Sequence, residues 1–147
     1  MIKRFTFALL AGFLFLISCN NKTEKAEDFY REGIRALEKN QYEEALQAFN
    51  EAIKYNDEDP RFYYYRGNVY LNQNNFQKAI ANYEKAIASD STYYDAWANK
   101  GTAIFYQSGD KDKACPYWVK AQNLGKENMR NKVKGCAAAE RPALSTH

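Results

Sequence analysis

The stretch from Phe29 to Ala52 reads FYREGIRALEKNQYEEALQAFNEA, and its pattern returns twice further along the chain. The later copies are YYYRGNVYLNQNNFQKAIANYEKA at 63–86 and WANKGTAIFYQSGDKDKACPYWVKA at 97–121. In each copy an aromatic residue precedes a glycine by four positions, and the glycines recur every thirty-four residues, at Gly33, Gly67 and Gly101. A fixed period of this length is typical of a repeat architecture rather than of an ordinary globular domain.

A second signature in each copy indicates a pair of helices. In the first copy it consists of Ala45, Phe49 and Ala52, whose spacing places them on one helical face. Small residues at Gly33 and Ala45 allow two antiparallel helices to approach closely, and we expect Phe49 to fill the gap towards the neighbouring repeat. The polar stretch at 38–41 suits a tight turn between the two helices. Each copy is therefore predicted to be a helical hairpin that buries its apolar face by stacking on the next one.

Because spacing and residue type agree three times, the chain resembles the tetratricopeptide repeat family over about residues 26–125. The resemblance implies an all-α fold, an α-solenoid of three tetratricopeptide helical hairpins plus a C-terminal capping helix. The expected organisation is three repeats at 26–59, 60–93 and 94–125, a capping helix at 126–138 and a disordered tail at 139–147.

The first eighteen residues differ from the repeats and are typical of a bacterial export signal. Two basic residues precede the apolar run from Phe5 to Ile17, which is shorter than the roughly twenty residues that a membrane-spanning helix needs. The run leads into Leu16-Ile17-Ser18-Cys19, which resembles the lipobox of bacterial lipoproteins. That resemblance implies a signal peptide at 1–18, a lipid on the Cys19 thiol and a lipidated tether at 19–25. The alternative is a simple secretory signal that ends in a buried cysteine.

The expected lipid would place the protein in the bacterial cell envelope. Several acyl chains on one residue give stable membrane attachment, because each buried methylene contributes about 0.8 kcal/mol. Asn20 follows the cysteine, and the aspartate that the usual sorting rule associates with inner-membrane retention is not there. The expected location is therefore the outer membrane of a Gram-negative bacterium, with the periplasmic or the surface side left open.

The charge balance argues against a general nucleic-acid-binding role. The whole chain has a formal net charge of +3, and removal of residues 1–18 would leave 19 basic against 18 acidic residues. Such a balance gives no broad attraction to a phosphate backbone. Residues 120–147 hold six basic and two acidic side chains, and a solvated end of the solenoid explains this more simply than contact with anionic lipid or polysaccharide.

The two remaining cysteines are expected to form a disulfide, as a leftover pair in an exported protein usually does. Gly125-Lys126 would form the turn between the last repeat helix and the capping helix, and Cys115 and Cys136 each lie ten residues from that turn. They would therefore lie level in an antiparallel hairpin, which predicts a Cys115–Cys136 bond. The bond would contribute on the order of 3 kcal/mol. Two buried free thiols are the alternative.

Partner binding is expected on the concave surface, which in the family is lined by the first helix of each repeat. The positions that the resemblance carries over are rich in tyrosine, which gives large contact areas, and in asparagine, whose amide can pair with a peptide backbone. We expect Asn68 to act in this way. The predicted groove residues are Tyr30, Arg31, Arg61, Tyr64, Tyr65, Asn68, Asn72, Asp95, Asn99 and Tyr106. A simpler alternative is that tyrosine, with twelve copies, is merely abundant here.

The resemblance argues against one mode of binding. Some relatives hold chain-terminal carboxylates in a clamp that needs lysine, asparagine and arginine at fixed groove positions. In this chain those positions hold Tyr30, Ile34, Tyr65, Asp95 and Asn99. An uncompensated Asp95 would also repel a carboxylate.

Catalysis by this chain is not expected. Its single histidine is the last residue, His147, and no strand precedes the repeat glycines to form a phosphate loop. No metal site and no cofactor other than the covalent lipid are predicted. The sequence thus predicts a membrane-anchored adaptor or scaffold for a protein or peptide partner, with its oligomeric state open. The alternatives are a self-associating structural lipoprotein, or an accessory subunit that stacks a polysaccharide or small ligand on Tyr64 and Tyr65.

Overall fold

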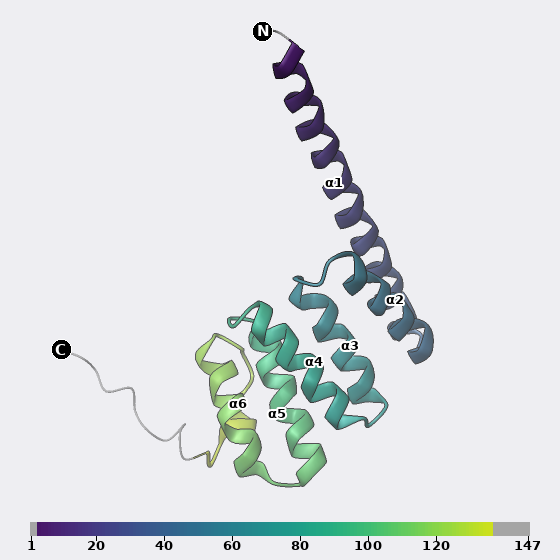
Figure 1. Cartoon of the computed structure of the whole chain (residues 1–147). Coiled ribbons are helices and arrows are strands. Elements are labelled where there is room, and N and C mark those ends of the chain that lie inside the picture. The colour runs from purple at the N-terminus through teal and green to yellow at the C-terminus, as the bar shows by residue number, and fades with distance from the viewer. Residues whose placement is uncertain (1–2, 137–147) are drawn as a thin grey trace, which may run out of the picture. The chain divides into compact units, whose positions relative to one another are not determined.

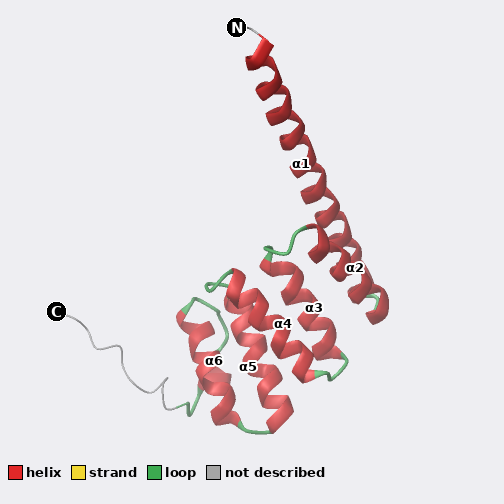
Figure 2. Cartoon of the chain, viewed as in Figure 1, coloured by secondary structure: helices red, strands yellow, loops and turns green. Residues whose placement is uncertain are grey.

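The computed structural model describes the backbone of residues 3–136 and the side chains of residues 21–136 (Figure 1). Within that range every regular element is a helix, and short turns join the helices (Figure 2). The elements are α1 (Lys3–Glu38), α2 (Tyr42–Tyr55), α3 (Pro60–Asn72), α4 (Phe76–Ser89), α5 (Tyr94–Ser108), α6 (Lys111–Asn123) and α7 (Arg130–Val133). The predicted all-α fold of helical hairpins is confirmed, and the tail predicted at 139–147 lies outside the described residues.

The chain forms two compact units, the first ending at Glu58 and the second beginning at Asp59. In the first unit α1 runs without a break to Glu38, so residues 19–25, predicted as a lipidated tether, are helical. That stretch contains no proline or glycine that would interrupt the backbone hydrogen bonds. Ala26 is only 1% exposed, so the helix is packed from the start of the first repeat. Among the described residues no helix is long and apolar enough to cross a membrane.

Each repeat glycine lies where an aromatic ring of the second helix meets the first helix. A Cβ atom on Gly33 would lie 2.6 Å from Cε1 of Phe49. The second unit repeats this contact twice: a Cβ atom on Gly67 would lie 2.7 Å from Cε1 of Tyr83, and one on Gly101 would lie 2.7 Å from Cδ1 of Trp118. Phe49 was expected to fill the gap towards the next repeat, and its contact with Gly33 inside its own hairpin was not predicted. The ring of Tyr83 makes both kinds of contact, because it packs against Gly67 in its own hairpin and also clusters with Ala103 of α5 in the next one.

The turns inside the hairpins depend on residues with a left-handed backbone. Asn40 and Asn74 have φ values of 57° and 58°, and Gly109 has a φ of 68° in the third turn. Asparagine and glycine adopt this conformation at the least cost, which explains why polar stretches containing them become turns. Aspartates precede two of the helices. Asp110, after the third hairpin turn, accepts hydrogen bonds from backbone N–H groups in the first turn of α6, and Asp59, between α2 and α3, accepts one from the backbone N–H of Arg61 in α3.

The core of the second unit continues past α6 into residues 126–136, which we call the cap. Three cap residues, Met129, Val133 and Cys136, are buried in one cluster with Trp118. The helix within the cap is shorter than the predicted 126–138, because α7 spans only Arg130–Val133. Left-handed residues stand on either side of it, with φ values of 61° at Asn128 and 79° at Gly135. An α-helix of L-residues cannot continue through this conformation.

Candidate functional site

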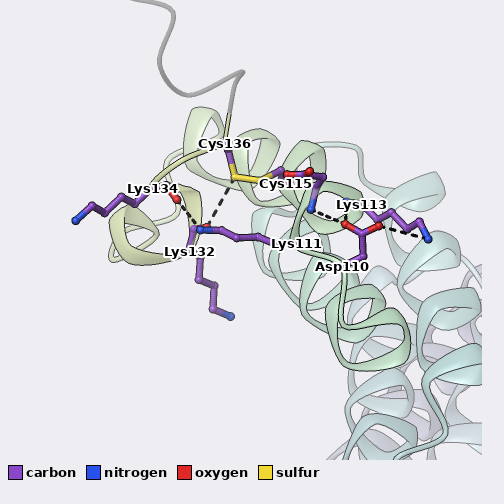
Figure 3. The surroundings of a disulfide bond; sticks show 8 residues. Asp110, Lys111, Lys113, Cys115, Lys132, Lys134 and Cys136 are labelled. Atoms are coloured by element: carbon purple, nitrogen blue, oxygen red, sulfur yellow. Dashed lines mark hydrogen bonds and ion pairs between the residues drawn. A yellow bond between two sulfur atoms is a disulfide. The ribbon is translucent and has the colours of Figure 1, made fainter.

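The cap is bonded covalently to α6 (Figure 3). The structure joins Cys115 and Cys136 in a disulfide with their Cα atoms 5.6 Å apart, and this is the pair that the sequence analysis expects. Lys111 donates a hydrogen bond from its Nζ to the backbone carbonyl of Lys134. A covalent bond, this polar contact and the buried side chain of Val133 therefore fix the course of the cap across the end of the second unit.

Five of the predicted groove residues of the second unit gather on one face. Tyr64 and Asn68 lie one turn apart on α3, while Asp95 and Asn99 lie one turn apart on α5, followed by Thr102. The cap brings two lysines to the same helix, as described below. We call this surface the α3/α5 face and define it by Tyr64, Tyr65, Asn68, Asp95, Asn99, Thr102, Lys126 and Lys132.

A hydrogen-bonded cluster joins the second and third repeats at the centre of this face. Nδ2 of Asn99 donates to the Tyr64 hydroxyl at 3.2 Å and to Oδ1 of Asn68 at 2.9 Å. The Tyr83 hydroxyl donates to the same Oδ1 at 2.8 Å. The carbonyl half of the Asn68 amide is thus occupied by the protein itself, and its N–H half also hydrogen-bonds with the Tyr64 hydroxyl. At most one amide N–H remains for a peptide, so the expected pairing with a peptide backbone is limited to donation from one N–H.

The tyrosines of this cluster are neutral at physiological pH. Burial raises the pKa of Tyr64, and the hydrogen bond with Asn68 offsets this only in part. Burial also raises the pKa of Tyr83, whose ring is fully buried. Both hydroxyls therefore keep their protons and act as hydrogen-bonding groups without charge.

The ring of Tyr64 is packed among other rings. Its centroid lies 5.0 Å from that of Tyr65, 5.0 Å from that of Tyr93 and 6.0 Å from that of Tyr83. Tyr64 and Tyr65 meet edge to face at 80°, so they do not offer one flat surface. The stacking platform considered for a polysaccharide is therefore not formed by this pair.

Asp95 is paired with a lysine from the cap, and its treatment as uncompensated is wrong. Nζ of Lys126 forms a hydrogen-bonded ion pair with Oδ1 of Asp95 and lies 5.6 Å from the centre of the Tyr94 ring. The hydrogen bond with Asp95 is the main reason why the pKa of Lys126 is raised. The repulsion expected between Asp95 and an acidic ligand is consequently cancelled by the protein.

The other predicted groove residues have contacts of their own. In the first unit Arg31 pairs with Glu27 at 3.6 Å, and the Tyr30 ring lies 6.3 Å from that of Phe49. In the second unit Arg61 forms an ion pair with Asp59 at 2.7 Å, at the start of α3. Asn72 ends α3, and Tyr106, 59% exposed, contacts Phe76 near the next turn. In the second unit, Arg61, Asn72 and Tyr106 therefore lie near the ends of α3 and α5, whereas Asn68 and Asn99 lie within these helices.

Sequence reasoning missed several members of the site. Tyr83 is not among the predicted groove residues. It occupies the same position in its hairpin as Phe49, but its hydroxyl needs a hydrogen-bond partner and finds one in Asn68. Lys126 and Lys132 are not among the predicted groove residues either. No repeat position corresponds to these two lysines, because they follow the last repeat, so the sequence held no periodic signal for them.

Comparisons with known proteins agree with this architecture. The family model described as Tetratricopeptide repeat matches residues 30–94 and 67–122. The chain is 28% identical to the Photosystem I assembly protein Ycf3 of Rippkaea orientalis, over 84% of this chain and 81% of that protein. It is 27% identical to the Hsp70-Hsp90 organizing protein 2 of Arabidopsis thaliana, over 80% of this chain but only 19% of that longer protein.

One solved structure shares the fold at a similar level of identity. The TPR2B domain of yeast Sti1, solved in a complex with pHsp70, superposes with a TM-score of 0.65 and 27% identity over 80% of this chain and 89% of that chain. The family match covers more than half of the chain, and all three hairpins share the glycine–aromatic contact. The chain therefore belongs to the tetratricopeptide repeat family.

Proposed function

We propose that this chain is an adaptor that binds a peptide segment of a protein partner on the α3/α5 face. The observation that carries the proposal is the cluster of Asn99, Tyr64 and Asn68, because the protein fixes these side chains before any partner arrives. A face that is already ordered loses little conformational entropy on binding. The similarity to a repeat domain solved in a complex with pHsp70 supports a protein-binding role.

The chemistry of the face suits an extended peptide. The remaining N–H of Asn68 can bond a backbone carbonyl, while Tyr65 adds an aromatic edge for apolar side chains. Because the hydroxyls of Tyr64 and Tyr83 remain neutral, recognition at the centre of the face depends on hydrogen bonds and ring contacts. The proposal assigns no catalytic step to the chain.

We further propose that a lipid on Cys19 anchors the adaptor to the bacterial envelope, at the outer membrane. Support comes from the order of a basic start, an apolar run and Leu16-Ile17-Ser18-Cys19 in the sequence. Anchoring would raise the effective concentration of the face near membrane-associated partners. The lipid would thus provide location and the repeats would provide specificity.

Crosslinking and co-purification from native membranes test the adaptor role. Wild type is compared with Tyr65→Ala, which removes a ring from the face, and with Tyr42→Ala, a matched loss of a tyrosine at the α1–α2 turn. We expect a defined partner that is lost with Tyr65→Ala and kept with Tyr42→Ala. Recovery of the protein alone, unchanged in both variants, would replace the adaptor with a self-associating structural lipoprotein.

A further inference from the structure

Among the charged residues that define the α3/α5 face, one lacks an ion-pair partner. Asp59 neutralises Arg61, and Asp95 neutralises Lys126. Lys132 has no ion-pair partner among the described residues. Its Nζ donates to the Thr102 hydroxyl at 2.8 Å, and Thr102 is neutral. The residues that define the face therefore carry one positive charge in excess, and this charge lies beside Thr102 of α5.

The surroundings of Lys132 favour the arrival of an anion. Its ammonium lies 5.6 Å from the centre of the Trp118 ring, which removes part of its hydration. This partial burial, together with the nearby Lys126 ammonium, lowers the pKa of Lys132. A carboxylate placed beside the ammonium would offset both effects. The residue is still exposed on its outer side, so a ligand can reach it.

The cap holds Lys132 in a fixed place. The neighbouring Val133 is buried, and Cys136 is bonded to Cys115 one turn further along. Lys134, two residues on, points its side chain away from the disulfide and into solvent (Figure 3). The two lysines belong to the same short segment but differ in what they face, so Lys134 is a matched control for Lys132.

We propose that Lys132 is the anion-recognising residue of the α3/α5 face, and that the bound peptide places an aspartate or glutamate side chain against it beside Thr102. This rests on the proposed adaptor function and names the class of its partner, a peptide segment with an acidic side chain. Asn68 of the neighbouring helix α3 offers one remaining N–H to the backbone of the same segment, since its Oδ1 and its other N–H are engaged within the protein. An internal side chain fits better than a chain end, because only one ammonium is unpaired while Lys126 is engaged by Asp95.

Selection from a displayed random-peptide library tests the proposal. The peptides are fused to the display protein through their C-termini, so that every carboxylate they offer is a side chain. The targets are the full-length chain in detergent with its disulfide intact, and its Lys132→Met, Lys132→Arg and Lys134→Met variants, each shown to be folded by circular dichroism. For wild type we expect one position enriched in Asp and Glu by about fivefold, as for a partly exposed ion pair. Lys132→Met should remove this enrichment, whereas Lys132→Arg and Lys134→Met should keep it.

The outcomes separate this inference from the proposed function. Peptides selected without an acidic position, or with the same acidic position in Lys132→Met, would overturn the role of Lys132 and leave the adaptor standing. A failure of the wild type to select any peptide would remove both proposals. Binding to vesicles of phosphatidylglycerol and phosphatidylcholine that depends on Lys132, without acidic selection, would assign the charge to lipid contact and also overturn the inference.

Discussion

Replacement of Gly67 by alanine should destabilise the protein, although the same change in the interior of a helix normally stabilises it by about 1 kcal/mol. The new Cβ atom would lie 2.7, 3.0 and 3.2 Å from three ring atoms of Tyr83. That ring is fully buried, and its hydroxyl bonds Asn68 at 2.8 Å, so it cannot move aside without losing a hydrogen bond. Overpacking of this kind and a lost hydrogen bond outweigh the helix propensity, and we expect a net loss of about 2 kcal/mol.

Urea unfolding followed by circular dichroism measures this loss on the chain from Asn20 onward. The control is the same substitution in a Tyr83→Leu background, where the ring is absent and Gly67→Ala should be neutral or stabilising. A gain of stability from Gly67→Ala in the wild-type background would refute the packing argument. An equal loss in both backgrounds would show that the ring is not the cause.

Three further predictions concern the tyrosine cluster, the cap and the anchor. Burial raises the pKa of Tyr64 and Tyr83 above the ordinary 10.0, so the folded protein keeps protons that the unfolded chain loses at alkaline pH. The contribution of these two tyrosines to the free energy of unfolding is therefore complete below pH 10 and falls as the pH rises further. In urea titrations, Tyr83→Phe should reduce the decrease of the free energy of unfolding above about pH 10, while lowering that free energy at neutral pH by about 1 kcal/mol. An unchanged decrease in this alkaline range would contradict this prediction. Reduction of the Cys115–Cys136 bond should add two hydrogens by intact mass and lower the thermal midpoint by roughly 10 °C, whereas an unchanged midpoint would mean that the cap does not need its bond. Metabolic labelling with an alkyne fatty acid should mark the wild type but not Cys19→Ser, and equal labelling of both would remove the anchor proposal.

The fold was predictable because it is encoded locally and repeated. The period of Gly33, Gly67 and Gly101 names the helices that must approach closely, and three copies of one pattern confirm one another. Periodicity says which residues share a helical face, but it does not say which partner that face meets. The close contact of Phe49 with its own glycine was missed for this reason.

The candidate site was predictable only for residues at repeat positions. Asn68 and Asn99 were found from their positions, and the structure does bring them together. The ion pair of Asp95 with Lys126 was missed because it depends on the course of the chain after α6. That course is set by left-handed residues such as Gly125, at φ 97°, and by a distant cysteine pair, and no local pattern encodes such a contact.

The shared acceptor on Asn68 also gives the repeats a fixed order. Asn99 lies thirty-four residues after Tyr65, so the second repeat has a tyrosine where the third has its asparagine. If the second repeat were duplicated in tandem, the copy would present Tyr65 to Asn68 and the amide donor now at 2.9 Å would be missing. The interface between these two hairpins is thus specific for the third repeat as the neighbour of the second. Lengthening the array by simple gene duplication would require a compensating substitution at this interface.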